Sequence, residues 1–285
     1  MLRSVKTLEE YAIQATDGPI GQVKDLYFDD ARWVIRYLVV DTGTWLSSRE
    51  VLITPWALNK PNWPDRLLPV SITREQVKNS PDIDTHQPVS RQNEMQVLGY
   101  YGYPSYWDGT NLWGDGPSPY AMAVGYDGQR LDRAERNREQ EATLAADRLR
   151  HRNDDPHLRS CNAVQGYHLH ASDGDIGHVA GFLVDEDSWA IRYLIVKTTN
   201  WWVGHEVLIA PLWITAVHWP DQSVSVDLTR EAIRQAPVYD DTAVLDHAWE
   251  ARLYAHHGRP LVWPDGGSGS AAETAGSLLA ASRFV

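Results

Sequence analysis

The sequence is poor in sulfur and in phenylalanine: its 285 residues include one cysteine, three methionines and three phenylalanines. A single cysteine excludes a disulfide bond within the chain and gives no sign of an oxidising compartment. No base stands beside Cys161 in the sequence to activate its thiol as a nucleophile. We therefore expect Cys161 to be an ordinary thiol.

Long apolar runs and an excess of basic residues are also missing. No stretch approaches the ~18 apolar residues that a membrane helix needs, and residues 1–11 lack the apolar segment of a secretory signal. Lysine and arginine number 26 against 38 acidic residues, and the resulting net charge of −12 disfavours nucleic acid and anionic lipid as partners. We expect a cytoplasmic protein without membrane insertion and without a nucleic-acid partner.

Recognisable catalytic motifs are absent from the sequence. It contains no Walker loop, no G-x-G-x-x-G fingerprint, no G-x-S-x-G elbow and no C-x-x-C pair. Acidic residues are numerous enough to form pairs by accident, so they predict no acid–base dyad. We expect no catalytic residue and no cofactor, and a hydrolase is the least favoured alternative.

Tryptophan and tyrosine are abundant, at 13 residues each, and the sequence repeats itself at a spacing of 156 positions. The match runs without a gap from Tyr11 to Trp107. Three pairs of segments show it: YAIQATDGPIG from Tyr11 with YHLHASDGDIG from Tyr167, WVIRYLVV from Trp33 with WAIRYLIV from Trp189, and EVLITP from Glu50 with EVLIAP from Glu206. A period this long indicates two duplicated domains rather than a solenoid.

Each copy has the pattern of a small β unit. Alternating and β-branched residues predict five strands and one helix in the first copy: 11–15, 21–28, 33–41, 50–55, 67–72 and 74–79. Asp17-Gly18 marks a tight turn, and Thr73 with Gln76 forms a capping box at the helix start. Strand 33–41 is apolar on both faces, as in a covered barrel. We predict a mainly β protein of two small antiparallel barrels, each followed by a short helix, with irregular arms beyond Pro81.

The copies are joined by a segment of different composition. Residues 100–128 are rich in Gly, Pro, Tyr and Trp, and residues 130–153 form a mixed-charge stretch that predicts a solvated helical linker. The last segment is rich in Gly, Ala and Ser and predicts a disordered tail. The predicted division is therefore 1–99, 100–160, 161–265 and 266–285.

The order of these motifs resembles the PRC-barrel family. The motifs are a DG-x-x-G turn, a strand ending in YLVVD, then EVLI-x-P and a helix opening with TRE, and the resemblance covers residues 5–80 and 161–236. The family's fold occurs in the cytoplasmic domain of the photosynthetic reaction-centre H subunit and in the C-terminal domain of a ribosome-maturation protein. The resemblance implies a docking or assembly barrel without catalytic residues. A role in photosynthetic electron transfer, like that of the H subunit, rests on family analogy alone.

We accordingly favour a non-catalytic protein-interaction or assembly module, with a protein partner or a second copy of itself. Aromatic anchors dominate the energy of protein interfaces. The predicted interface residues lie in loops 44–48 and 200–204 and in segment 100–113: Trp45, Tyr106, Trp107, Trp201 and Trp202.

Two charged pairs recur in both copies. Arg36 and Arg192 lie within apolar strands, whereas Glu50 and Glu206 begin strands that we expect to be close to them. We predict two structural ion pairs, Arg36 with Glu50 and Arg192 with Glu206, because a buried charge must be paired.

The alternative function is the binding of a small ligand or metal, in the cleft between the barrels or at histidines. His168 and His170 are spaced i, i+2 on a predicted strand, so their imidazoles would share one face. The first copy has Ala12 and Gln14 at these positions, which makes surface histidines the better interpretation. We therefore predict no metal site and keep this pair as the weak candidate.

Overall fold

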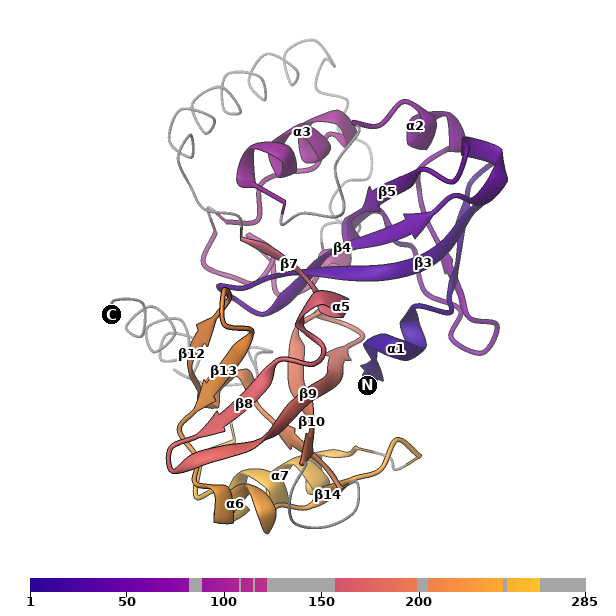
Figure 1. Ribbon diagram of the computed structural model, residues 1–285. Helices are drawn as coiled ribbons and strands as arrows, with labels where there is room; N and C mark the ends of the chain where they lie inside the picture. The colour runs from indigo at the N-terminus through magenta and orange to yellow at the C-terminus, as the bar shows by residue number, and fades with distance from the viewer. Residues whose placement is uncertain are drawn as a thin grey trace.

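The protein is mainly β, with two mixed sheets stacked one above the other in the view of Figure 1. The computed structural model describes residues 1–81, 89–107, 109–114, 116–121, 157–198, 205–242 and 245–261. We refer to residues 1–121 as the N-terminal half and to residues 157–261 as the C-terminal half. The predicted charged linker 130–153 and tail 266–285 lie outside the described residues.

The sheet of the N-terminal half has the strand order β5-β4-β3-β2-β6, and β7 pairs with β3 beside this path. β2 and β6 run parallel, and the other pairs are antiparallel. The strands are β2 (Ala12–Ala15), β3 (Gly18–Asp29), β4 (Val34–Asp41), β5 (Glu50–Ile53), β6 (Leu67–Pro69) and β7 (Leu158–Ser160).

The sheet of the C-terminal half has the order β12-β13-β8-β9-β10-β11-β14, and β1 pairs with β9 beside it. Here β13 and β8 form the parallel pair. The strands are β1 (Leu2–Ser4), β8 (His168–Ala171), β9 (Gly174–Asp185), β10 (Ile191–Thr198), β11 (Glu206–Ile209), β12 (Ile214–His218), β13 (Ser223–Val226) and β14 (Val238–Tyr239).

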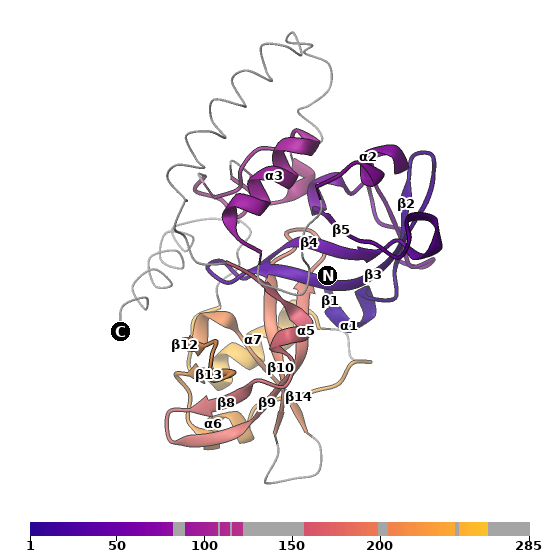
Figure 2. The same cartoon turned by 45° about the horizontal axis from the view of Figure 1, so that its top comes forward.

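Short helices cover the sheets and lie between them. In both views α1 and α5 lie between the sheets, while α2 and α3 accompany the first sheet and α6 and α7 the second (Figures 1 and 2). The α-helices are α1 (Val5–Leu8), α2 (Arg74–Lys78), α3 (Arg91–Tyr101), α5 (Cys161–Val164), α6 (Arg230–Arg234) and α7 (His247–His256). The 3-10 helices are η1 (Gly43–Leu46), η2 (Pro55–Ala57), η3 (Pro119–Ala121) and η4 (Pro211–Trp213). None of the helices so described is long and apolar enough to cross a bilayer.

The mainly β prediction is confirmed, but the two sheets are not the purely antiparallel barrels expected from the sequence. After β5, at one edge of its sheet, the chain crosses to the opposite edge, where β6 runs in the same direction as β2. This crossover creates the parallel pair, and the second half repeats it with β13 and β8. Among the residues that the structure describes, neither path of paired strands closes on itself.

The short helix after the last strand is confirmed, and the irregular arm after Pro81 is partly wrong. Thr73 and Gln76 make the full capping box of α2, whereas Thr229 caps α6 without a capping box. Beyond Pro81, however, α3 and α7 form two further helices. The side chains of Ser90 and Asp246 cap them by accepting a hydrogen bond from a backbone N–H.

The DG-x-x-G motif serves the fold in both halves. Asp17 accepts a hydrogen bond from the backbone N–H of Arg74 at 2.8 Å, and so joins the tight turn to the start of α2. The last glycine of the motif lies against the neighbouring strand. A Cβ on Gly21 would lie 1.9 Å from the carbonyl oxygen of Asp41, and one on Gly177 would lie 2.1 Å from that of Lys197. These motif residues therefore have structural roles.

Candidate functional site: the contact between the two halves

Each half contributes one short strand to the sheet of the other. β1 pairs with β9, with Leu2 opposite Asp185, and β7 pairs with β3, with Leu158 opposite Asp29. The two exchanged strands have the same sequence, Leu-Arg-Ser, and lie 156 positions apart, as do their partner residues. The exchange is therefore reciprocal and follows the internal repeat.

A second set of main-chain contacts repeats this reciprocity. The backbone N–H of Ile35 donates to the carbonyl of Trp189 at 2.8 Å, and that of Ile191 donates to the carbonyl of Trp33 at 2.7 Å. Each of these residues lies 156 positions from its counterpart. Such an interface is isologous, as in a twofold homodimer, although both sides belong to one chain.

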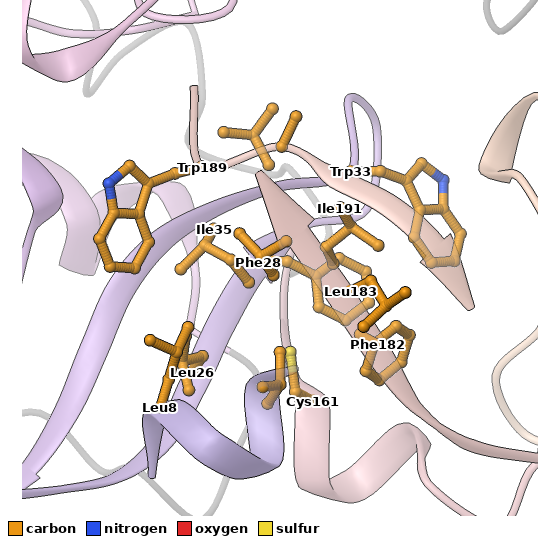
Figure 3. Packing of buried hydrophobic residues seen from close by; sticks show 14 of the residues in the cluster. Leu8, Leu26, Phe28, Trp33, Ile35, Cys161, Phe182, Leu183, Trp189 and Ile191 are labelled. Atoms are coloured by element: carbon orange, nitrogen blue, oxygen red, sulfur yellow. The ribbon is translucent and has the colours of Figure 1, made fainter. Parts of the chain in front are cut away.

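Trp33 and Trp189 occupy a strained conformation at this contact. Their φ angles are 56° and 59°, in the left-handed region that bulky residues avoid, and both side chains are buried. Strain of this kind costs on the order of 1–3 kcal/mol per residue and persists only where the surroundings enforce it. Figure 3 shows Trp189 on the side of Ile35 and Trp33 on the side of Ile191, in line with the reciprocal hydrogen bonds.

Aromatic and aliphatic side chains fill the space between the halves. Phe28 stacks on Trp33, with ring centroids 5.1 Å apart, and contacts Phe182 of the other half at 5.8 Å. Cys161 lies in the same cluster, fully buried (Figure 3). Burial raises the pKa of the Cys161 thiol well above its usual value, with further contributions from Asp25 and Glu9. A buried thiol held protonated is unreactive, in agreement with the ordinary thiol expected from the sequence.

Two arginines close the rim of the interface in the same reciprocal way. The Nε–H of Arg3 donates to Glu186 at 3.0 Å, and that of Arg159 donates to Asp30 at 2.9 Å. Each arginine also covers a tryptophan ring of its own half: Arg3 lies 4.1 Å from the centroid of Trp63, and Arg159 lies 4.2 Å from that of Trp219. Arginine here combines a cross-half ion pair with a cation–π contact.

We define the aromatic arm as the described residues of 103–121. The arm contacts the C-terminal half, and among the described residues no segment of the C-terminal half makes the equivalent contact. The indole N–H of Trp113 donates to the carbonyl of Ser188 at 2.7 Å. The indole N–H of Trp189 donates to the hydroxyl of Tyr120 at 3.0 Å, and the hydroxyl of Ser118 donates to the carbonyl of Asp187 at 2.7 Å. The arm thus joins the N-terminal half to the turn that precedes β10.

Two arginines of the N-terminal half hold the arm in place. Arg32 donates to the carbonyls of Asn111 and Gly109, at 2.7 and 3.0 Å. Arg36 donates to the carbonyl of Leu112 at 2.6 Å, and its guanidinium lies 3.7 Å from the ring centroid of Tyr106. Carbonyl oxygens of an irregular segment need donors when they are covered, and these guanidinium groups supply them.

A buried charged network lies under the arm. Arg36 pairs with Asp29 at 3.4 Å, and Arg91 pairs with Glu94 at 3.1 Å. The hydroxyl of Tyr106 donates to Glu94 and accepts from Arg91 at 2.8 Å. Burial raises the pKa of Glu94 to about 7, against the opposing effect of the Arg91 charge. Loss of solvation also lowers the pKa of Arg36, and the neighbouring Asp29 opposes that shift.

The C-terminal half has a corresponding network around Glu250. Arg192 pairs with Glu250 at 3.2 Å, and the hydroxyl of Tyr193 donates to the same carboxylate at 2.7 Å. Glu94 and Glu250 lie 156 positions apart, on α3 and α7. The recurrence of this glutamate could have been found in the sequence, because it follows the repeat spacing beyond Pro81. It was missed because the region was expected to be irregular.

The predicted partners of the two strand arginines are wrong. Glu50 lies opposite Asp41 on β4, five residues from Arg36 and therefore about 16 Å along the strand, and it pairs with Lys24 instead. Glu206 likewise lies opposite Lys197, five residues from Arg192. The first residue of β5 or β11 meets the last residues of the preceding strand, because antiparallel neighbours run in opposite directions. Both arginines do form buried ion pairs, but with Asp29 and Glu250.

The predicted interface aromatics are partly used inside the protein. Tyr106 is 1 % exposed, so it cannot present itself to another protein, and this prediction is wrong. Trp107 is half-buried, with the Arg91 guanidinium 4.3 Å from its ring centroid. Trp45 is also half-buried: its indole N–H donates to the carbonyl of Ile20, and Arg74 lies 4.3 Å from its ring. The remaining two predicted residues, Trp201 and Trp202, lie outside the described residues.

The two histidines of the weak metal candidate contact different residues of β9. His168 lies opposite His178 on β9, and His170 contacts Asp175 through its Nδ1 atom. Across the described ranges, no three or more His, Cys, Asp or Glu side chains are grouped so that they could hold a metal ion.

Part of the N-terminal half is similar to a known family. Residues 4–71 match the PRC-barrel domain. The matched segment begins at the end of β1 and runs through β6, so it includes the strands β2 to β6 of the N-terminal sheet. No curated protein matches the chain.

Proposed function

We propose that this protein is a non-catalytic interaction and assembly module made of two PRC-barrel units, one in each half. The first unit is supported by the family match at residues 4–71. The second is supported by the recurrence of the same strands, caps and main-chain contacts 156 positions later. The proposed partner is a protein, either a different protein or a second copy of this chain. The proposed role requires no cofactor.

The observation that carries this proposal is the reciprocal exchange of β1 and β7. A strand from each half completes the sheet of the other, so the two units are held in one fixed relation. A fixed pair of units presents two outer surfaces at a defined spacing, which suits a scaffold that binds at two points.

The polar residues that recur in both halves also favour a scaffold over an enzyme. Asp17 and Asp173 cap helices, whereas Arg36 and Arg192 are buried in ion pairs. A catalytic group must instead face a site that a substrate can reach. The analogy with the reaction-centre H subunit adds no specific observation, and the cytoplasmic location remains a prediction from composition.

The proposal is tested by native mass spectrometry of the tagged full chain purified from its own cells. We expect a complex of defined stoichiometry, with a protein partner or a second copy, and no stoichiometric small molecule. A monomer that carries a stoichiometric metal, lost in His168→Ala, would replace the assembly role with metal binding. A small organic ligand at one equivalent, or turnover of a substrate, would equally overturn it.

A further inference from the structure

The C-terminal sheet ends in a strand whose outer side has no partner strand. β12 pairs with β13 on one side and is the last strand of its path, and no other strand in the described part of the chain pairs with it. Figure 1 shows β12 at the margin of the C-terminal half. A terminal strand presents a row of unpaired N–H and C=O groups to any extended segment.

The side chains of this edge offer no protection against pairing, although an irregularity at Thr215 shifts the register of β12 against β13. β12 reads Ile-Thr-Ala-Val-His, with no lysine, acidic residue, proline or glycine. Thr215 and His218 are exposed, and Ile214, Ala216 and Val217 are half-buried. Leu212, just before the strand, is one of the few large apolar residues of the described chain that is exposed, at 37 %.

The N-terminal half provides an internal control for this edge. The residues 156 positions earlier, 58–62, read Leu-Asn-Lys-Pro-Asn, so that Lys60 and Pro61 stand where β12 has Ala216 and Val217. This segment forms only two isolated bridges, Leu58 with Val70 and Asn62 with Leu67. Lysine and proline are the residues with which natural sheets block their edges, because a charge resists burial and proline lacks an N–H.

We propose that β12 is a self-association edge, at which two copies of the chain pair their β12 strands antiparallel about a twofold axis. This inference rests on the proposed assembly function and specifies its surface and its partner. It would join the two C-terminal sheets into one continuous sheet.

A second copy fits this edge better than a charged peptide does. The edge offers main-chain groups and uncharged β-branched side chains, so it selects a strand of the same kind, and the chain itself carries one. Twofold antiparallel pairing is self-complementary, since each copy donates and accepts the same main-chain hydrogen bonds. The small side chain of Ala216, at the middle of the strand, leaves room for close approach. Because each copy has a net charge of −12, salt should strengthen the association by screening their repulsion.

The first test moves the blocked edge from one half to the other. Sedimentation velocity over a range of concentrations compares the full wild-type chain with Ala216→Lys/Val217→Pro and with the exposed-site variant Thr215→Lys. We expect a monomer–dimer equilibrium that tightens with added salt and a dimer dissociation constant at least tenfold higher in both variants. Circular dichroism checks the fold, and Thr215→Lys keeps the test valid if proline disrupts the strand. The matched control, Lys60→Asn in the N-terminal half, should dimerise like the wild type.

The second test locates the contact. Single cysteines replace Thr215, Ala216 or Val217 in turn, and oxidation should give an interchain disulfide from at least one, because paired strands bring Cα atoms within reach. Cys161 is fully buried and does not compete. Lys60→Cys is the control and should form no interchain disulfide, although it should still dimerise through β12.

The outcomes separate this inference from the broader proposal. A wild-type chain that is monomeric at every concentration, or dimers that both β12 variants leave unchanged, would overturn self-association through β12. The assembly role would still stand if native mass spectrometry found a protein complex. Crosslinking through Lys60→Cys alone would place the contact on the N-terminal half and also overturn the inference.

Discussion

Val34 forms an antiparallel bridge with Ala190, the residue that holds the same position in the second copy of the repeat. A residue that meets its own counterpart lies next to the local twofold axis. The two halves are thus arranged like the subunits of a homodimer, but they are connected within one chain. Their contact is satisfied within the chain, so the proposed self-association uses another surface, the edge strand β12.

A disulfide across this axis should stabilise the protein. In Val34→Cys/Ala190→Cys, the bridge geometry brings the two thiols together, and the bond would close a loop of more than 150 residues in the unfolded chain. We expect a gain of about 2–4 kcal/mol in the free energy of unfolding. Urea denaturation with and without reductant measures it, and Val34→Cys alone is the control. Formation of interchain disulfides only would contradict the pairing of the halves within one chain.

The two rim arginines should contribute equally to stability. Arg3→Ala and Arg159→Ala each remove one partly buried ion pair across the halves and one cation–π contact. We expect each variant to lose about 1–2 kcal/mol of unfolding free energy. Chemical denaturation of both variants and of the double variant measures the losses. If one variant lost much unfolding free energy and the other lost none, the two equivalent contacts would contribute unequally to stability.

Glu94 should make the protein less stable as the pH rises from about 4.5 to about 7. Burial raises the pKa of Glu94 from 4.5 to about 7, so the folded protein keeps a proton that the unfolded chain loses in this range. The unfolded state then binds fewer protons, and the free energy of unfolding falls with pH until it levels off above 7. The total loss of unfolding free energy is about 3 kcal/mol, since each pKa unit corresponds to about 1.36 kcal/mol.

The matched variant for this prediction is Glu94→Gln, which keeps the shape but cannot ionise. Its free energy of unfolding, measured by urea denaturation between pH 4 and pH 8, should lack the decline that the wild type shows. The difference between the two profiles isolates Glu94 from the other titrating groups. Parallel profiles would mean that the carboxyl of Glu94 titrates in the folded protein as it does in the unfolded chain.

Local patterns allowed much of the fold to be predicted, and long-range pairing accounts for what was missed. The turn at Asp17-Gly18, the cap at Thr73 and the apolar strand 34–41 depend on neighbouring residues, so they were readable from the sequence. The exchanged strands are only three residues long, and β1 pairs with a strand some 180 residues away. No local pattern specifies such a partner.

The candidate site shows the same limit. The sequence indicated that Arg36 would be buried in an ion pair, because an arginine within an apolar strand needs a counter-charge. The choice among carboxylates, however, depends on strand register and on the position of α3, neither of which a single sequence contains. Glu50, the recurring carboxylate chosen from the sequence, lies at the wrong end of the hairpin, whereas Asp29, which recurs as Asp185, pairs with Arg36.

The last glycine of the DG-x-x-G motif should be intolerant of any side chain. In Gly177→Ala, the new Cβ would lie 2.1 Å from the carbonyl oxygen of Lys197, a backbone atom that cannot move without breaking the pairing of β9 with β10. Gly181 lies on the same strand, and its Cβ would meet only the Ile195 side chain, at an ordinary 3.6 Å. We expect Gly177→Ala to lose several kcal/mol, on the order of 3, and Gly181→Ala to change the unfolding free energy by less than about 1 kcal/mol. Thermal and urea denaturation of the two variants provide the comparison. Equal stabilities would show that the strands can separate at Gly177 and that the motif is retained for another reason.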